Sequence, residues 1–385
     1  MAPPKKTRWP IEPHTQTKHL ILRRYLQAWL PIMGRYNGRI LFVDGFAGPG
    51  RYAGGEEGSP LIALRTLLTH PQFQAAQGQR EAIFIFIERE QDRAGALRDE
   101  LRQFEAKSAI PAWVKYQVRQ GEFAPEMTSV LDSVARTGKN LAPAFAFIDP
   151  FGFAGAPMAV VKRIMANPRC ECLITFMYES VNRFVGHPEA AIQAHFDELF
   201  GTERWRPLIV EADPDRRRAG LVGLYRDQLI RAAGTRFVRT FEMINRGNRT
   251  EYFLYFATNS PHGLSKMKEV MWRADPAGGQ AFSDLTDTRQ MVLLEQAADL
   301  LPLQGLLREH FRGRGWVDIS EVERFVLEDT PYSETIHLRR GTLGEMEKTK
   351  VPTLEARRPA GKRDRPGEYP AGTQLKFGQL TATTT

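Results

Sequence analysis

The chain has 385 residues, of which 42% are hydrophobic and 25% charged, and its formal net charge is +8. This composition is ordinary for a soluble globular protein, and the length is sufficient for two domains. No apolar run approaches the ~20 residues that span a bilayer, and the N-terminus lacks an apolar signal core. We therefore expect a soluble, cytoplasmic protein with no membrane partner. The positive charge favours a polyanionic partner, and nucleic acid is the first candidate.

The first 15 or so residues are polar and contain prolines, which predicts an extended arm. From Thr15 to about Ile32 apolar residues recur every three or four positions, which predicts an amphipathic helix. Two histidines, His14 and His19, lie in its first turns. They are either cap and surface groups or side chains that reach a cofactor pocket.

Short apolar runs alternate with helical patterns over the next part of the chain. Continuous apolar runs suit strands that are buried on both faces of a parallel sheet. Five such alternations predict an α/β fold with a doubly wound, mostly parallel sheet of the Rossmann-like type. The expected strands span residues 40–43, 82–87, 113–118, 144–148 and 172–177, followed by a hairpin of strands 236–241 and 252–257.

The only two cysteines, Cys170 and Cys172, lie on the apolar run of the fifth expected strand. No second pair completes a zinc site, so we expect reduced core cysteines and no metal centre.

A Pro- and Gly-rich change of composition at 273–280 suggests a domain edge. Three helical patterns (303–311, 320–327 and 333–347) and two possible strands follow it, which predicts a winged helix-turn-helix domain. We therefore expect an α/β domain over 1–280, a winged helix domain over 281–378 and a disordered tail over 379–385.

A glycine-rich stretch follows the first expected strand. Glycines there permit a tight turn beside a ligand, and Asp44 can accept hydrogen bonds from an ammonium group. The Gly-Lys-Ser/Thr ending of a phosphate-binding loop is absent, and the next helix starts too late, at Ser59-Pro60, to hold a pyrophosphate. S-adenosylmethionine has no phosphate and needs no such geometry. The expected cofactor-binding residues here are Asp44, Phe46, Ala47, Gly48 and Gly50.

Acidic residues also follow the next strands. Glu88 ends the second strand, where a carboxylate can accept both ribose hydroxyls. Glu122 follows the third strand and is a candidate for the adenine amino group. Together with Asp44, these residues point to a nucleoside cofactor.

The fourth strand ends in Asp149-Pro150-Phe151-Gly152. The Asp149 carboxylate and the carbonyl beside Pro150 can accept from an amino group, and Phe151 can stack on a flat base. These three are the expected catalytic residues, acting by positioning the acceptor rather than as a strong base. The alternative is an Asp-Pro turn that merely closes a strand.

Basic residues crowd the last helix and the tail, where they can neutralise phosphates. The alternative is a charged hairpin used for protein contacts. The expected nucleic-acid-binding residues are Arg339, Arg340, Arg357, Arg358, Lys362 and Arg363.

Together these motifs resemble the class I S-adenosylmethionine-dependent methyltransferases, and the glycine motif is close to that of amino-methyltransferases of nucleic acid. More narrowly, the chain resembles the three-Cys-motif partner protein family, named for a neighbouring protein of radical S-adenosylmethionine type. The residues that carry this narrower likeness are Trp9, Pro13-His14-Thr15, Lys18-His19, Tyr25-Leu26, Ala28-Trp29, Gly58-Ser59-Pro60-Leu61 and Asn182-Arg183-Phe184.

The resemblance implies a methyltransferase that uses S-adenosylmethionine and works on nucleic acid with a three-Cys-motif partner. Amino-methyltransferases usually carry a second proline and then an aromatic residue where this chain has Phe151-Gly152. That departure favours the second hypothesis, a non-catalytic accessory subunit that binds the cofactor or nucleic acid and recruits substrate to the partner. The long loop 51–58 is also unusual for the family and is a candidate lid.

Overall fold

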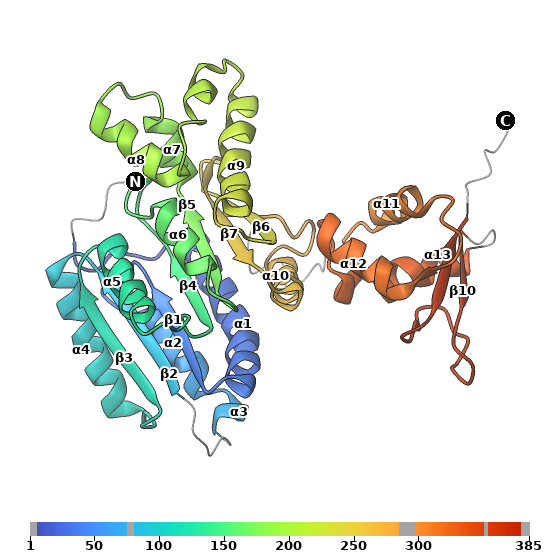
Figure 1. Ribbon diagram of the computed structural model, residues 1–385, viewed down its shortest axis with the longest axis horizontal. Helices are drawn as coiled ribbons and strands as arrows, with labels where there is room; N and C mark the ends of the chain where they lie inside the picture. The colour runs from blue at the N-terminus through green and yellow to red at the C-terminus, as the bar shows by residue number, and fades with distance from the viewer. Residues whose placement is uncertain (1–5, 75–80, 285–297, 350–352, 379–385) are drawn as a thin grey trace. The chain divides into compact units, whose positions relative to one another are not determined.

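The computed structural model describes residues 6–74, 81–284, 298–349 and 353–378. They form two compact units (Figure 1). The described residues of the first unit fall within 1–263 and 281–286, and those of the second within 264–280 and 287–385.

The first unit contains a sheet in the order β3-β2-β1-β4-β5-β7-β6-β8. Strands β1 to β5 run parallel, and β7 is inserted antiparallel between β5 and β6. The run 3-2-1-4-5 is the doubly wound order, so the predicted α/β fold with a mostly parallel sheet is confirmed. The strands are β1 (Arg39–Asp44), β2 (Glu81–Glu88), β3 (Val114–Gln120), β4 (Ala144–Ile148), β5 (Glu171–Phe176), β6 (Phe237–Ile244), β7 (Thr250–Thr258) and β8 (Ala281–Ser283).

Helices cover both faces of this sheet, as crossover connections between parallel strands require. The helices are α1 (Pro13–Tyr36), α2 (Ser59–Leu68), α3 (Pro71–Gln74), α4 (Gln91–Lys107), α5 (Phe123–Ala135), α6 (Met158–Met165), α7 (Tyr178–Phe184), α8 (Ala190–Phe200), the 3₁₀ turn η1 (Arg206–Val210), α9 (Pro214–Arg231) and α10 (Pro261–Ala274), which runs from the first unit into the second.

Alternate side chains of the central strands enter two separate cores. Leu41 and Val43 face a core shared with α5, α6, α8 and α9. Phe145 faces the other side, where its ring lies 5.3 Å from that of Tyr25 and 5.9 Å from that of Trp29, both on α1. Both faces of the sheet are therefore closed, which leaves its edges and strand ends for ligands.

Both cysteines lie in the core as free thiols, as predicted. Burial raises the pKa of Cys170 to about 12, so its thiol is unreactive at neutral pH.

The second unit packs helices against a small antiparallel sheet of order β10-β11-β9. The predicted third helix is a π-helix, η2, which continues into α13. The elements are α11 (Leu301–Phe311), β9 (Val317–Asp318), α12 (Ile319–Asp329), η2 (Glu334–Leu343), α13 (Gly344–Lys348), β10 (Leu354–Arg357) and β11 (Gln374–Phe377). The winged helix assignment of this unit stays a prediction, and the tail expected to be disordered, 379–385, lies outside the described residues.

Within the described ranges, no helix has the length and apolar character needed to cross a bilayer.

Candidate functional site

A cavity of about 350 Å³ opens at the carboxyl ends of β1 and β4. Strand β1 pairs with β2 on one side and β4 on the other, so the chain order reverses between β1 and β4. Open α/β sheets bind ligands at this switch point. The walls come from the N-terminal arm and α1, the loop after β1, the turn after β4, Met177, and the start of β7.

The loop after β1 needs its glycines for two different reasons. Gly48 and Gly50 have φ values of +62° and +83°, in the left-handed region that favours glycine. A Cβ on Gly45 would lie 2.6 Å from the Phe123 ring, so this position has no room for a side chain. Phe46, Ala47, Gly48 and Gly50 all line the cavity, and their predicted role in cofactor binding stays a prediction.

Asp44 lies beneath this loop and is completely buried. Its Oδ1 accepts a hydrogen bond from the Phe46 amide at 3.2 Å, whereas its Oδ2 has no partner among the described residues. Burial raises the pKa of Asp44 to about 7, although the Ser59 side chain and the Phe46 amide offset part of the rise. An unpartnered buried carboxylate oxygen is costly, and a bound ammonium group would satisfy it.

Glu88, at the end of β2, is also buried and is fixed by two backbone amides. Its Oε2 accepts from Gly48 at 2.9 Å and its Oε1 from Glu90 at 2.8 Å. Each carboxylate oxygen keeps a further lone pair for a ligand hydroxyl. Neither Asp44 nor Glu88 is among the residues that line the cavity, and Glu122, which is exposed at the start of α5, does not line it either.

Asp149, at the end of β4, is held by Lys18 of α1. The Lys18 Nζ lies 2.6 Å from both carboxylate oxygens and 4.8 Å from the centre of the Tyr252 ring. Lys18 is 5% exposed, so this ion pair lies in the wall of the cavity and not on the surface. Pro150 and Phe151 line the cavity beside it.

Both histidines of the first helix line the cavity and are buried, so they are not surface groups. Burial and the charge of Lys18 lower the pKa of His19 to about 3, so its imidazole is neutral at physiological pH. His14 Nδ1 lies 2.9 Å from Asp284 Oδ2, and its Nε2 lies 3.0 Å from Glu12.

Aromatic rings and an arginine form the wall around Phe151. The Phe151 ring meets the Trp9 ring edge-on at 5.4 Å, and Trp9 meets Tyr52 at 5.7 Å. The Arg93 guanidinium lies 5.0 Å from the Trp9 ring and 5.4 Å from the Phe151 ring. Phe151 is therefore packed on one side and keeps its contact with the cavity on the other.

The loop 51–58 is closed into a tight hairpin. Arg51 and Glu57 form an antiparallel bridge, and the Gly58 amide donates to the Gly50 carbonyl at 2.8 Å. Glu100 of α4 binds Arg51 through Oε2 at 2.8 Å and Arg8 of the arm through Oε1 at 2.7 Å. One buried carboxylate thus holds both segments that frame the cavity mouth.

Lys18 and Arg93 were not predicted as site residues. Each occupies the buried face of its own helix, since Lys18 is four residues before Leu22 and Arg93 is four residues before Leu97. A cation on an apolar helix face is a recognisable sequence pattern, because a buried charge needs a partner.

The six predicted nucleic-acid-binding residues belong to the second unit and lie in two kinds of environment. Arg339 and Arg358 are engaged in internal ion pairs, with Glu323 and with Glu347. The other four, Arg340, Arg357, Lys362 and Arg363, are exposed. Among the described residues, no group of three or more His, Cys, Asp or Glu is arranged to hold a metal ion.

No family model matches this chain, and no curated protein matches its sequence. Solved structures that it resembles include a Geobacter metallireducens GS-15 precorrin-6y C5,15-methyltransferase, with 12% identity over 61% of this chain and 87% of that one, at a TM-score of 0.29. Another is the METTL16 MTase domain, with 11% identity over 61% of this chain and 66% of that one, at a TM-score of 0.28.

A third is a Porphyromonas gingivalis W83 protein assigned provisionally as a methyltransferase, with 12% identity over 57% of this chain and a TM-score of 0.25. The match spans only 37% of that protein's length. All three TM-scores lie below 0.5, so these likenesses carry no argument about function.

Proposed function

We propose that this chain is an S-adenosylmethionine-dependent methyltransferase that acts on nucleic acid. The observation that carries the proposal is Asp44 Oδ2, which has no hydrogen-bond partner among the described residues. Asp44 is buried directly beneath the glycine loop that lines the cavity at the switch point of the sheet, although it is not itself a lining residue. A carboxylate in that position is suited to the α-ammonium group of a methionine moiety. The absence of a phosphate-binding lysine in the loop argues against a nucleotide phosphate.

The residues around Asp44 fit the rest of the cofactor. Glu88, already oriented by the Gly48 and Glu90 amides, retains acceptor capacity for ribose hydroxyls. Aromatic rings in the wall, including Phe46 and Tyr52, offer faces that attract a sulfonium cation. When bound, S-adenosylmethionine supplies an electrophilic methyl group.

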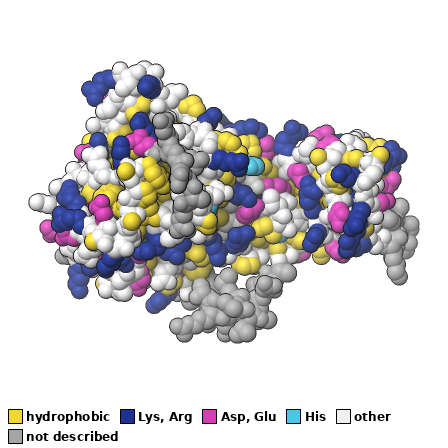
Figure 2. Space-filling view, turned by 90° about the horizontal axis from the view of Figure 1, so that it is seen from below, with side chains coloured by type: hydrophobic (Ala, Val, Ile, Leu, Met, Phe, Trp, Pro, Cys, Tyr) yellow, Lys and Arg dark blue, Asp and Glu magenta, His cyan; other side chains and the backbone are white. Residues whose placement is uncertain are grey.

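Asp149, Pro150 and Phe151 occupy the part of the cavity proposed for the acceptor. The Lys18 ammonium fixes the Asp149 carboxylate, and the Pro150 carbonyl is a second acceptor at the same strand end. These groups would hold an acceptor amino group by hydrogen bonds and orient its lone pair, which lowers the entropic part of the barrier. Nucleic acid is favoured by the net charge of +8, with Lys and Arg spread over the face seen in Figure 2.

A second candidate is an accessory subunit that binds cofactor or nucleic acid and presents substrate to a three-Cys-motif partner. The Lys18 ion pair favours it, because Nζ lies within 2.6 Å of both Asp149 oxygens and competes with an acceptor amine. The resemblance of the N-terminal motifs supports the identity of that partner.

Isothermal titration with S-adenosylmethionine and S-adenosylhomocysteine tests the cofactor. Absence of binding at high micromolar cofactor would refute the enzyme proposal. Transfer of a radiolabelled methyl group to a panel of DNA and RNA, with and without the partner, then separates the two candidates. Cofactor binding with no transfer under any condition would favour the accessory role.

A further inference from the structure

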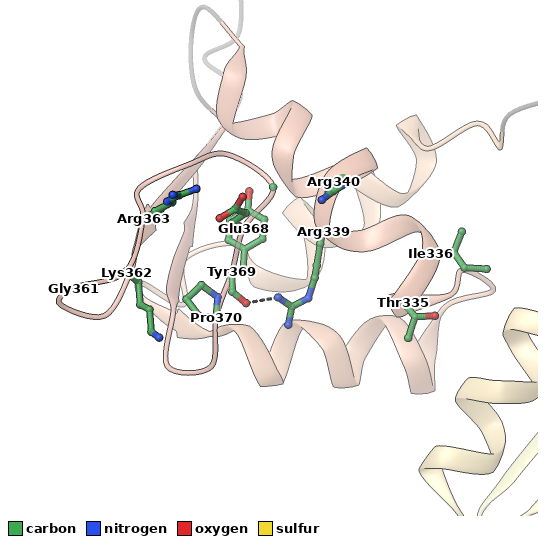
Figure 3. Close-up of a pocket in the computed structure, with 11 residues that line it drawn as sticks. Thr335, Ile336, Arg339, Arg340, Gly361, Lys362, Arg363, Glu368, Tyr369 and Pro370 are labelled. Atoms are coloured by element: carbon green, nitrogen blue, oxygen red, sulfur yellow. Dashed lines mark hydrogen bonds between the residues drawn. The ribbon is translucent and has the colours of Figure 1, made fainter. Parts of the chain in front are cut away.

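A second hollow, of about 750 Å³, lies in the second unit between the π-helix η2 and the loop 358–373 that joins β10 to β11. Figure 3 shows Arg339 and Arg340 on the helix side, with Lys362 and Arg363 on the loop. Four basic side chains and one acidic side chain, Glu368, line this groove. The excess of positive charge points to an anionic ligand.

Two arginines fix the walls of the groove. Arg339 donates to the Tyr369 carbonyl and to Glu323 at 2.6 Å, which ties η2 to the end of the loop (Figure 3). The side chain of Arg358 is 3% exposed and binds Glu347 at 2.8 Å, together with the carbonyls of residues 365 and 368. The loop is therefore held in place before any ligand arrives, which reduces the entropic cost of binding.

The remaining lining cations are not used by the fold. Arg340, Lys362 and Arg363 are exposed, and none of them forms an ion pair with a carboxylate in the described part of the chain. Arg357 is different, because its guanidinium lies 3.9 Å above the Trp316 ring and does not line the groove. Three free cations thus face the groove from two opposite walls.

The chemistry of the lining favours a sugar-phosphate strand over an acidic protein. Protein interfaces depend on buried apolar and aromatic anchors, and the exposed large apolar side chain in this groove is Ile336. Guanidinium forks match phosphate oxygens, and evenly spaced phosphates suit cations on both walls. Gly361 and Gly367, with φ of +77° and +88°, leave the loop backbone open to close approach.

We infer that one phosphodiester strand of a nucleic acid lies in this groove and is held by Arg340, Lys362 and Arg363 without regard to sequence. Arg339 and Arg358 shape the groove but do not contact the strand. This inference rests on the proposal that nucleic acid is the acceptor class. Three phosphate contacts contribute about −2.7 to the slope of log K for binding against log salt concentration for duplex DNA, or about −2.1 for a single strand. This slope is called the salt slope.

The test measures fluorescence anisotropy of the full chain with labelled 20-nucleotide DNA and RNA, each as single strand and duplex, from 50 to 200 mM salt. The triple variant Arg340→Ala, Lys362→Ala, Arg363→Ala should make the salt slope for duplex DNA less steep by about 2.7. Wild-type affinity then falls about 40-fold more than that of the variant over this salt range.

The matched control is Arg312→Ala, Arg314→Ala, Arg324→Ala, which removes three exposed charges of the same unit that do not line the groove. It should change the slope by less than about 1. Equal flattening by both triple variants would mean diffuse attraction and would overturn the inference. The inference would also be overturned if the wild-type chain bound none of the four probes at 50 mM salt. An acidic protein would then be the remaining candidate partner.

Folding and cofactor binding are checked separately. Both triple variants should unfold at the wild-type temperature, because their substitutions are exposed, and should bind S-adenosylmethionine as the wild type does. If the groove variant misfolds, Arg363→Glu must weaken oligonucleotide binding more than Arg324→Glu, and equal effects would overturn the inference. The binding assay contains no cofactor, so a chain that binds nucleic acid but not S-adenosylmethionine would refute the proposed function alone.

Discussion

Replacing Asp44 by asparagine should weaken cofactor binding and, at the same time, stabilise the free protein at alkaline pH. The substitution keeps the shape of the side chain but removes the charge proposed to hold the ammonium group. Loss of one partner from a buried, hydrogen-bonded charge pair costs about 2–5 kcal/mol, which corresponds to at least ~30-fold in Kd. Isothermal titration with S-adenosylhomocysteine at pH 8 measures this loss.

The stability effect follows from the raised pKa. Burial raises the pKa of Asp44 from 3.8 to about 7. Between pH 3.8 and pH 7 the folded chain therefore keeps a proton on Asp44 that the unfolded chain has released. The contribution of Asp44 to the free energy of unfolding is therefore fully present below pH 3.8 and is lost as the pH rises through 7. The total loss is about 4 kcal/mol. Asp44→Asn should abolish this loss, at a pH-independent cost of about 1–3 kcal/mol for an unpartnered amide.

The same titration makes cofactor affinity depend on pH. Only the ionised carboxylate pairs with an ammonium group, so wild-type Kd should be about tenfold weaker at pH 6 than at pH 8, and the variant should lack this dependence. Asp99→Asn, an exposed change on α4, is the control and should match the wild type in both assays. Wild-type affinity that is constant from pH 6 to 8 and unchanged in Asp44→Asn would refute the assigned role.

Three further outcomes test other parts of the molecule. Asp149→Ala should abolish methyl transfer in a radiolabel assay while cofactor Kd stays within a few-fold, and equal loss of both would mean that its acceptor role is misassigned. Gly45→Ala should lower the free energy of unfolding by about 1–3 kcal/mol in urea, because the new methyl group would lie 2.6 Å from the Phe123 ring, and an unchanged midpoint would contradict this. Arg358→Ala should cost about 3–5 kcal/mol because it leaves the largely buried Glu347 carboxylate without its cation, whereas Arg357→Ala, at an exposed position, should cost far less; similar costs would show that the Arg358–Glu347 ion pair does not hold the loop.

Most of the sheet could be predicted because β1, β2, β4, β5 and β7 are apolar runs that are largely buried on both faces. Helix α10 was not predicted from the sequence. Its buried face contains Lys268, which is 1% exposed and donates to three backbone carbonyls of residues 326, 327 and 330, each at 2.9 Å. Buried apolar residues recur at helical spacing on both sides of it, at Leu264, Met267, Met271 and Ala274, but nothing local in the sequence indicates that distant carbonyls will satisfy Lys268.

Asp44, Glu88 and Asp149 could be predicted to lie at one edge of the sheet, because each ends or follows a strand and parallel strands end at the same edge. The same reasoning could not supply Lys18, whose partner Asp149 is 131 positions away along the chain. The assignment of Glu122 to the cofactor stays a prediction, and the Glu122 side chain is exposed. The π-helical geometry of η2 likewise depends on packing that the sequence pattern does not encode.

The shared anchor at Glu100 has a kinetic consequence. Because the arm and the hairpin 51–58 are tied to the same carboxylate, neither can swing away from the cavity mouth without breaking an ion pair with a buried acid. Entry and exit of a ligand are then gated by the same opening event, which slows both steps without altering their ratio. A cavity built in this way favours a long residence time for the ligand that occupies it.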